Sequence, residues 1–479
     1  MKSYKNYEAV IGLEIHVELK TASKIFCSCP TTFGAEPNTQ ICPVCMGHPG
    51  TLPVLNRQAV NYAVKAGLAL GCDIASVSRM DRKNYFYPDL PKAYQISQFD
   101  HPICRGGHLD IETEGGKKRI GITRIHLEED AGKLIHDSRG TLIDCNRCGV
   151  PLIEIVTEPD ISSAEEAKAF LQKLRSVILY TGISDCKMNE GSIRCDVNLS
   201  VREIGAGTLG TRTEIKNINS FAFVAKAIEQ EYLRQAEAVS RGEAIIRETR
   251  RFDEKDGKTH SMRSKEDAND YRFFPEPDIP PFEISRELID ALSGEIPMLP
   301  DERKARYVSE FSLSSYDADI LVSQKTLADL FEEAAALTTH RKTLANLLIG
   351  EGLRLCEEDF SCPISKENLA SLADLSAEGV INSSTAKKLF ARIWKSDEDP
   401  CRIVEAEDLA LIRDRELLSG LVRQVLSENP SIAEDFRRGK TFAAKSAIGK
   451  VMSKTGGRAE PILLGEILEE ELKKALNEK

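Results

Sequence analysis

Acidic and imidazole side chains alternate with apolar ones near the N-terminus, between Val10 and Leu19. Apolar residues at every second position are typical of a half-buried β-strand, so Glu14, His16 and Glu18 share the opposite face of the expected strand. Same-face neighbours on a strand lie ~7 Å apart, a spacing that suits a metal ion or a polyphosphate held between them. Such a row by itself is more typical of a solvated edge strand. Its interpretation as a site depends on the strands that follow.

Later stretches of the chain also direct polar residues to one side of an expected strand. Residues 121–129 end in two carboxylates, residues 151–158 place Glu154 in an otherwise apolar strand, and residues 193–202 alternate cleanly. An ionised Glu154 in apolar surroundings is costly unless a cation accompanies it. Carboxylates in this number are the ligands that Mg²⁺ prefers, and bound Mg²⁺ would hold a triphosphate. We therefore expect a sheet with one functional face.

Four cysteines form two closely spaced pairs within one short segment. Thiolate pairs at this spacing suit tetrahedral zinc, and four sulfur ligands leave no open position for water, so the expected Zn²⁺ site is structural. Buried free thiols are the alternative. A second pair, Cys145 and Cys148, has no partner pair nearby and is interpreted as incidental. The expected zinc ligands are Cys27, Cys29, Cys42 and Cys45.

Cations are interleaved with aromatic residues and prolines between Asp81 and Lys92. This composition is typical of an ordered polar loop facing a nucleotide or an RNA end, and equally of a surface turn. We assign Arg82 and Lys83 to binding of the nucleotide cofactor, together with Lys216 of a later alternating segment.

The C-terminal segment carries a basic run that contains no acidic residue between Phe436 and Ala459. In a chain with a net charge of −11, this is where the phosphates of an RNA would bind. A solvated basic helix face is the alternative. The candidate RNA-binding residues are Arg437, Arg438, Lys440, Lys445, Lys450, Lys454 and Arg458.

Two helical patterns separate the expected strands. Ser162 and Glu165 have the spacing of a capping box before an apolar stripe, and a second helix is expected from about Ser220 to Arg241. Strands and helices mix without a βαβ rhythm, which favours an α+β class with an antiparallel sheet. The sequence contains neither a P-loop nor a kinase-type glycine loop, so ATP would require another fold.

Length and composition set the wider organisation. A chain of 479 residues is too long for one core, and six prolines between 275 and 300 indicate a domain boundary. We predict domains at 1–295, 296–405 and 406–479, the last two helical. No run approaches the ~18 apolar residues of a membrane span, and no signal peptide is evident. Thirteen cysteines without an export signal fit a cytoplasmic protein with free thiols and a metal site.

Long motifs between Val10 and Phe221 resemble those of the glutamyl/aspartyl-tRNA amidotransferase B subunits, the GatB/GatE family, and the resemblance extends over the whole chain. The motifs are collinear with the family: Val-Ile-Gly-Leu-Glu-Ile-His-Val-Glu-Leu, Asp-Arg-Lys-Asn-Tyr-Phe-Tyr-Pro-Asp, His-Leu-Glu-Glu-Asp-Ala-Gly-Lys, Pro-Leu-Ile-Glu-Ile-Val and Glu-Ile-Lys-Asn-Ile-Asn-Ser-Phe. The resemblance implies a cradle-shaped, glutamine synthetase-like kinase domain, a helical domain and a YqeY-like tail that holds tRNA. It places catalytic Mg²⁺ ligands at Glu14, His16, Glu129 and Glu154, with Asp196 as a further catalytic residue.

The implied activity is ATP-dependent phosphorylation of the side-chain carboxylate of Glu-tRNA(Gln) or Asp-tRNA(Asn), followed by amidation with ammonia. Nothing in the chain resembles a glutaminase, so the resemblance implies that an amidase, the A subunit, and a small C subunit are its partners in a heterotrimer. Two other classes remain open from the residues alone. One is a non-catalytic zinc and RNA-binding module, and the other is a structural scaffold that uses its strand faces for partners.

Overall fold

The computed structural model describes residues 4, 6–138, 140–264, 271–356, 360–437 and 442–477, and it divides the chain into two units, Met1–Pro300 and Asp301–Lys479. The first unit combines one large sheet with helices, and the second is helical. A mixed α+β class is thereby confirmed. The division into two units falls at the end of the proline-rich segment, and the domain bounds 1–295, 296–405 and 406–479 stay predictions. Among the described residues, no helix is long and apolar enough to cross a membrane.

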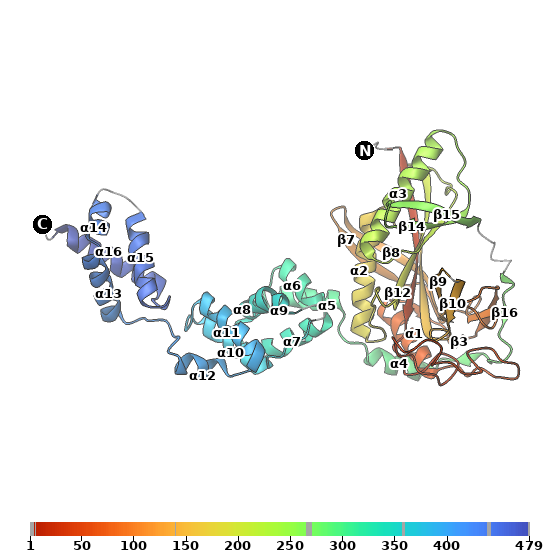
Figure 1. Ribbon diagram of the computed structural model, residues 1–479, viewed down its shortest axis with the longest axis horizontal. Coiled ribbons are helices and arrows are strands. Elements are labelled where there is room, and N and C mark those ends of the chain that lie inside the picture. Colours follow the sequence, from red (N-terminus) through yellow and green to blue (C-terminus); the bar gives the residue numbers. More distant parts are fainter. Residues whose placement is uncertain are drawn as a thin grey trace. The chain divides into compact units, whose positions relative to one another are not determined.

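Ten strands of the described chain form the large sheet, with β1 (Tyr7–Glu18) between β12 and β11 (Figure 1). Neighbouring strands pair antiparallel except β13 and β14, which run parallel. Strand β7 (His108–Thr113) pairs with β8 off the main path. That path runs β15 (Lys258–Ser264), β14 (Glu248–Asp253), β13 (Thr213–Lys216), β12 (Ile193–Glu203), β1, β11 (Pro151–Thr157), β8 (Gly116–Glu129), β6 (Cys104–Arg105) and β2 (Asp73–Ile74).

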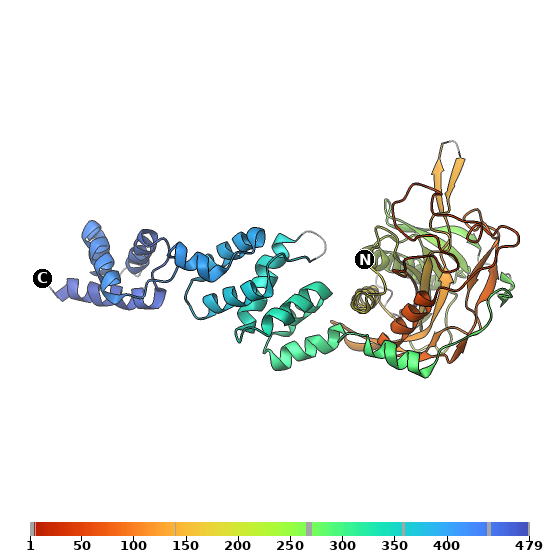
Figure 2. The same ribbon diagram turned by 90° about the horizontal axis from the view of Figure 1, so that it is seen from below.

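The expected alternation along β1 is confirmed. Ile11, Leu13, Ile15 and Val17 are buried in the main hydrophobic core, whereas Glu14 and His16 between them are only half-buried. Helices α2 (Ala164–Thr181) and α3 (Phe221–Ser240) contact each other and lie along the same side of the sheet (Figure 1). Helix α1 (Arg57–Ala69) joins the same core, and α4 (Arg286–Gly294) packs beside α1 (Figure 2). The polar row of β1 faces the other side.

The start of α2 differs by one residue from the expected capping box. The Ser163 hydroxyl accepts a hydrogen bond from the Glu166 backbone N–H, and the Glu166 carboxylate accepts from the backbone N–H of Ser162. Ser163 is therefore the N-cap, and the pair Ser163–Glu166 replaces Ser162–Glu165. Both serines are residue types that can cap a helix. Ser163 is the N-cap because its hydroxyl is the one that accepts from the Glu166 backbone N–H.

In the described part of the first unit, three small sheets accompany the large one. One of them, β16–β4–β5, borders the polar face because β5 also contacts β8. The small sheets consist of β16 (Phe274–Pro275), β4 (Asp81–Asn84) and β5 (Tyr94–Ser97); β9 (Lys133–Asp137) and β10 (Gly140–Asp144); and β3 (Val77–Ser78) and β17 (Phe282–Glu283).

The described residues of the second unit form two separate hydrophobic clusters, one within residues 307–404 and one within residues 418–472. Helices α5 to α12 carry the first: α5 (Pro300–Glu310), α6 (Ser315–Val322), α7 (Lys325–Ala335), α8 (Arg341–Leu347), the π-helix η2 (Leu348–Gly352), α9 (Leu353–Leu355), α10 (Lys366–Ala377), α11 (Ser383–Ser396) and α12 (Pro400–Ala406). The second is formed by α13 (Arg415–Glu428), α14 (Pro430–Arg437), α15 (Phe442–Lys454) and α16 (Pro461–Asn477).

Candidate active site on the polar face of the large sheet

Strand register gathers polar side chains from four strands. His16 of β1 lies opposite Glu154 of β11, which in turn lies opposite His126 of β8, and Glu14 lies opposite Asp196 of β12. Directly opposed residues on one sheet face have their Cβ atoms ~5 Å apart, so these side chains meet. The row on β1 is thus the centre of a wider polar surface.

A cavity of about 790 Å³ opens over this surface. Its carboxylate and imidazole floor comes from the sheet, and its other walls are basic and aromatic. The lining includes Glu14, His16, Lys83, Tyr85, His126, Glu128, Glu154, Arg212, Glu214, Lys216, Arg247, Tyr271 and Phe273.

One cluster in the cavity pairs two histidines with two glutamates. His16 Nε2 lies 3.4 Å from a Glu128 oxygen and 3.5 Å from a Glu154 oxygen, and His126 Nε2 lies 3.4 Å from Glu154. Burial opposes the charged forms, but the mutual hydrogen bonds and charges outweigh it. They raise the pKa of His16 to about 10 and hold the pKa values of Glu128 and Glu154 below their ordinary range.

A second cluster is richer in carboxylates. Glu14, Asp196 and Glu214 offer oxygens that lie within 4.8 Å of one another, with Lys216 paired to Asp196 and 3.3 Å from Glu214. Burial, followed by the charges of Glu154 and Glu214, raises the pKa of Glu14. One lysine does not offset this concentration of negative charge. The oxygen donor set and the raised pKa of Glu14 fit a hard divalent cation such as Mg²⁺.

The structure corrects the placement of Glu129. Its carboxylate forms an ion pair with Lys92 and accepts a hydrogen bond from the Ile96 backbone N–H at 2.8 Å, away from the cavity lining. Glu128 instead lies with His16. Consecutive residues of a strand point to opposite faces, so only one of the two glutamates can join the cluster.

The two expected cations of the 81–92 loop also separate. Lys83 lines the cavity, with its ammonium 5.1 Å from the centre of the Tyr271 ring. Arg82 lies outside the lining and forms two hydrogen bonds to the Glu276 carboxylate, at 2.6 and 2.9 Å. The two are adjacent on β4, where side chains alternate. The expectation that Arg82 contacts the nucleotide therefore has no support in this geometry.

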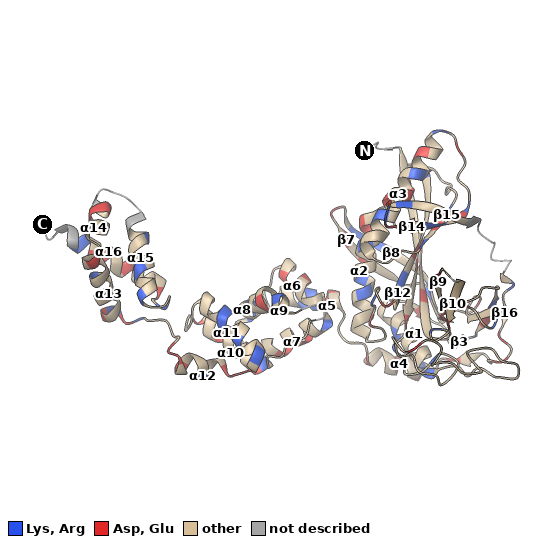
Figure 3. Cartoon of the chain, in the orientation of Figure 1, with Lys and Arg blue, Asp and Glu red and all other residues tan. Residues whose placement is uncertain are grey.

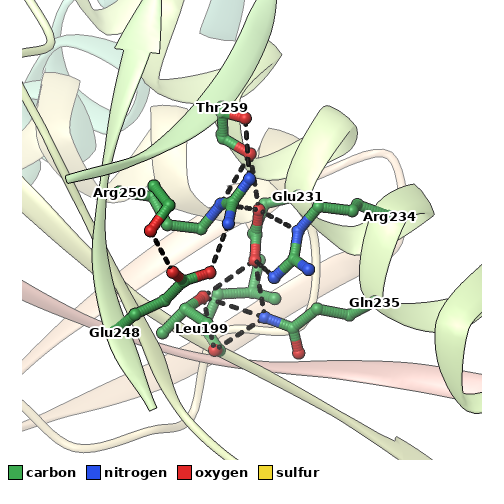
Figure 4. A network of polar contacts seen from close by, with 9 residues as sticks. Leu199, Glu231, Arg234, Gln235, Glu248, Arg250 and Thr259 are labelled. Carbon is green, nitrogen blue, oxygen red and sulfur yellow. Dashed lines mark hydrogen bonds and ion pairs between the residues drawn. The ribbon is translucent and has the colours of Figure 1, made fainter. Parts of the chain in front are cut away.

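A buried network under the sheet holds the strands that bear Glu214 and Lys216 (Figure 4). Glu231 of α3 is fully buried and accepts hydrogen bonds from Thr213 of β13 at 2.9 Å and from Thr259 of β15 at 2.7 Å. Arg250 of β14 lies 3.3 Å from the same carboxylate, and Arg234 pairs with it at 2.6 Å. One carboxylate thus ties three strands to α3, and Thr213 directly precedes Glu214.

The four expected zinc ligands come together. Cys27, Cys29, Cys42 and Cys45 offer sulfur atoms within 4.8 Å of one another. Hydrogen bonding from Cys27 lowers the pKa of Cys45 to about 4. Sulfur atoms crowded in this way around a thiolate fit a tetrahedral Zn²⁺ site. No described group of three candidate ligands includes Cys145 or Cys148.

Several of the basic tail residues already have partners within the chain, so fewer of them can contact an RNA phosphate than their number suggests. Figure 3 shows basic residues along α15 and acidic residues on other helices of the same unit. Lys450 donates to Asn429, Lys454 pairs with Glu428 and Arg458 pairs with Asp408, while Lys445 is exposed. Arg438, Lys440 and the side chain of Arg437 lie outside the described residues.

Sequence reasoning missed several cavity residues that alternation signals. His126 and Glu128 occupy alternate positions of an expected strand, and Glu214 belongs to the alternating segment that contains Lys216. No sequence signal marks Arg212, Arg247 or Tyr271, since each reaches the cavity from outside the large-sheet strands through tertiary packing.

Comparison with known proteins defines the class. Residues 9–290 match the family described as the GatB/GatE catalytic domain, and residues 329–472 match the GatB domain. The chain belongs to the GatB/GatE family.

The relatives that it resembles over nearly its whole length carry one name. The B subunit of the aspartyl/glutamyl-tRNA(Asn/Gln) amidotransferase of Caldicellulosiruptor saccharolyticus is 52% identical over 98% of this chain and 99% of its own length. The proteins of the same name from Caldanaerobacter subterraneus subsp. tengcongensis and Geobacter sulfurreducens are 52% and 49% identical, each over 98% of this chain and 100% of its own length.

Proposed function

We propose that this chain is the component of a tRNA-dependent amidotransferase that activates and amidates the aminoacyl group, making Gln-tRNA(Gln), Asn-tRNA(Asn) or both. The observation that carries the proposal is the convergence of two carboxylate clusters on one cavity of about 790 Å³. A cavity of this size admits a nucleotide and the end of a second substrate. The match of nearly the whole chain to amidotransferase B subunits supports the choice of reaction.

The chemistry requires an activated carboxyl group. The side-chain carboxylate of Glu-tRNA(Gln) or Asp-tRNA(Asn) attacks the γ-phosphorus of ATP, and the bond to the β,γ-bridging oxygen breaks to release ADP. The acyl phosphate then accepts ammonia at its carbonyl carbon, phosphate leaves with the C–O electron pair, and a proton is lost from nitrogen. Ammonia cannot displace oxide from a free carboxylate, so phosphorylation supplies the leaving group.

The residues divide these tasks. Glu14, Asp196 and Glu214, with His16, Glu128 and Glu154 beside them, would hold Mg²⁺. When bound, Mg²⁺ binds phosphate oxygens and offsets their charge. Lys83 and Lys216 add positive charge along the cavity, and the rings of Tyr85 and Tyr271 offer apolar faces to a base. The protein thereby positions the reactants and supplies fixed charges.

The partners follow from the chemistry and the family. We propose that an amidase, the A subunit, is the source of ammonia and that a small C subunit is the third member of a cytoplasmic heterotrimer. The large sheet would serve as a cradle of the glutamine synthetase type. The helices from about residue 406 would form a YqeY-like domain that holds the tRNA.

Ammonium salt as nitrogen donor tests the assignment. A complex whose amidase nucleophile is mutated should fail with glutamine but amidate Glu-tRNA(Gln) and Asp-tRNA(Asn) when given ammonium, ATP and Mg²⁺. Comparing the two tRNAs decides which products are made. Failure with ammonium in a complex that stays assembled and binds tRNA would show that the amide-forming step does not reside in this chain.

A further inference from the structure

A second, smaller cavity of about 220 Å³ adjoins the candidate active site. The two cavities share the side chains of Glu14 and Arg212. The small one continues along β1 past Glu14, where Gly12 lies opposite Asn198 of β12. Since Gly12 has no side chain, the face of the strand is open there.

Asn198 carries the observation that points to a ligand. Its amide nitrogen donates a hydrogen bond to Glu14 Oε1 at 2.8 Å, which fixes the orientation of the amide because a carboxylate only accepts. Its Oδ1 is buried and has no hydrogen-bond partner among the described residues, and the side chain lines the small cavity. Asn198 as a whole is 8% exposed. A buried acceptor without a donor lowers the stability of the fold. We therefore expect a ligand in this cavity to donate an N–H or O–H group to Asn198 Oδ1.

The rest of the lining limits the size and shape of that ligand. Val10, Val156 and Leu209 give the cavity apolar walls, and Leu209 is largely exposed at its mouth. Whole small-molecule ligands occupy roughly 300–1,000 Å³. The small cavity therefore suits one short group with methylene carbons, attached to something that extends into solvent.

Arg212 supplies the opposite charge at the junction with the larger cavity. Its guanidinium makes no hydrogen bond or ion pair with the residues that the structure describes. A carboxylate bound there would lie at the entrance to the phosphate-binding cavity. The same ligand would then place a donor at Asn198 and a carboxylate at Arg212.

We propose that the small cavity is the aminoacyl subsite, in which Asn198 Oδ1 accepts a hydrogen bond from the α-ammonium group and Arg212 binds the side-chain carboxylate. The inference rests on the proposed function and extends it to the recognition of the amino acid. It explains how the reacting carboxylate is presented to the nucleotide while the ester-linked tRNA remains outside. A free ammonium ion shares the N–H chemistry, but one ion needs only about the volume of a water, ~30 Å³, and no apolar walls.

Gly12 offers a graded way to fill the subsite. An added Cβ would meet Thr157 O at 3.8 Å and Pro159 Cα at 3.9 Å, ordinary contact distances, so Gly12→Ala fits without strain and Gly12→Val fills more of the space. Gly207→Ala is the matched control, since its Cβ would meet nothing within 4 Å and Gly207 does not line the cavity.

The experiment uses the assembled complex with two readouts. In equilibrium binding, the wild type should prefer Glu-tRNA(Gln) over uncharged tRNA by about 10- to 100-fold, as expected for a hydrogen bond to a charged group, and Gly12→Val should remove most of the preference. In ammonium-driven turnover, the KM for Glu-tRNA should rise through Gly12→Ala to Gly12→Val. The KM values for ATP and ammonium should stay within about twofold, and Gly207→Ala should match the wild type.

Three results would overturn the subsite. They are an unchanged preference for charged tRNA in both Gly12 variants, a rise confined to the KM for ammonium, or equal binding of charged and uncharged tRNA by the wild type. Asn198→Leu adds a test of the α-ammonium contact. The wild type should favour Glu-tRNA over N-acetyl-Glu-tRNA, and this ratio should fall toward one in the variant, whatever the loss in rate. Because binding needs no turnover, a wild type that binds as expected without hydrolysing ATP would contradict the kinase proposal alone.

Discussion

Glu128 Oε1 lies 3.4 Å from His16 Nε2, and the two side chains come from strands separated in the sheet by β11. Glu128 also accepts a hydrogen bond from the Ser97 hydroxyl at 3.3 Å, which fixes its second oxygen. The adjacent Glu129 has different partners, the Lys92 ammonium and the Ile96 backbone N–H. The two consecutive carboxylates thus have different partners, His16 and Ser97 for Glu128 and Lys92 for Glu129.

Substituting Glu128 and Glu129 one at a time tests which of the two carboxylates acts with Mg²⁺. Glu128→Gln should lower tRNA-dependent ATP hydrolysis on the order of 100-fold or more and raise the Mg²⁺ concentration needed for half-maximal rate, because a metal ligand contributes several kcal/mol to the transition state. Glu129→Gln should leave that Mg²⁺ concentration unchanged. Steady-state ATP hydrolysis across a Mg²⁺ titration measures both. A shift caused only by Glu129→Gln would reverse the assignment.

The Glu231 network should contribute stability that depends on pH. Burial would raise the pKa of Glu231, but Arg234, Gln235 and Thr259 outweigh it and lower the pKa below its ordinary value of 4.5. A lowered carboxyl pKa stabilises the fold fully above the unfolded value, and that contribution disappears as the pH falls through the folded value. Glu231→Gln should therefore cost roughly 3–5 kcal/mol at pH 7 and less as the pH drops below about 4.

Hydrogen exchange of the β13, β14 and β15 amides at several pH values measures this effect locally. Thr385→Ala in α11 is a control, since it lies in the other unit. The prediction fails if the cost of Glu231→Gln is independent of pH or if exchange in these strands does not change.

The cysteine cluster should bind about one zinc ion per chain. Cys45→Ser should abolish zinc binding and speed hydrogen exchange in the segment 23–54, because metal binding stabilises the loops that it joins. Elemental analysis of protein purified without chelators gives the stoichiometry. Cys401→Ser, at an exposed cysteine of α12, should retain the zinc. Zinc-free wild-type protein would contradict the site.

Lys445 is the clearest candidate for a phosphate contact in the tail, because it is exposed while Lys450 and Lys454 have partners in the fold. Lys445→Ala should weaken tRNA binding severalfold and reduce the slope of log Kd against log salt by about one, as for one lost phosphate contact. Binding titrations at several salt concentrations measure it. Lys395→Ala in α11 serves as the control, and an identical slope for the two variants would exclude a contact at Lys445.

Much of the local structure was predictable because its causes are local. The alternation in β1 set its buried and polar faces, and the four cysteines at knuckle spacing were found together. The motifs along the chain also sufficed to indicate the family, which the matches of residues 9–290 and 329–472 then confirmed. Even the error at the start of α2 was one residue, since neighbouring serines offer the same cap.

Only the tertiary structure decided which polar faces meet. Alternation says that a residue faces one side of a strand, but the order of strands in a sheet depends on packing between distant segments. That order places His16 against Glu154, brings Glu214 to Glu14, and turns Glu129 toward Lys92. Distant segments also decide that Arg82 pairs with Glu276. They likewise decide that Asn198 Oδ1 has no hydrogen-bond partner among the described residues. The residues next to Arg82 and Asn198 in the sequence indicate neither result.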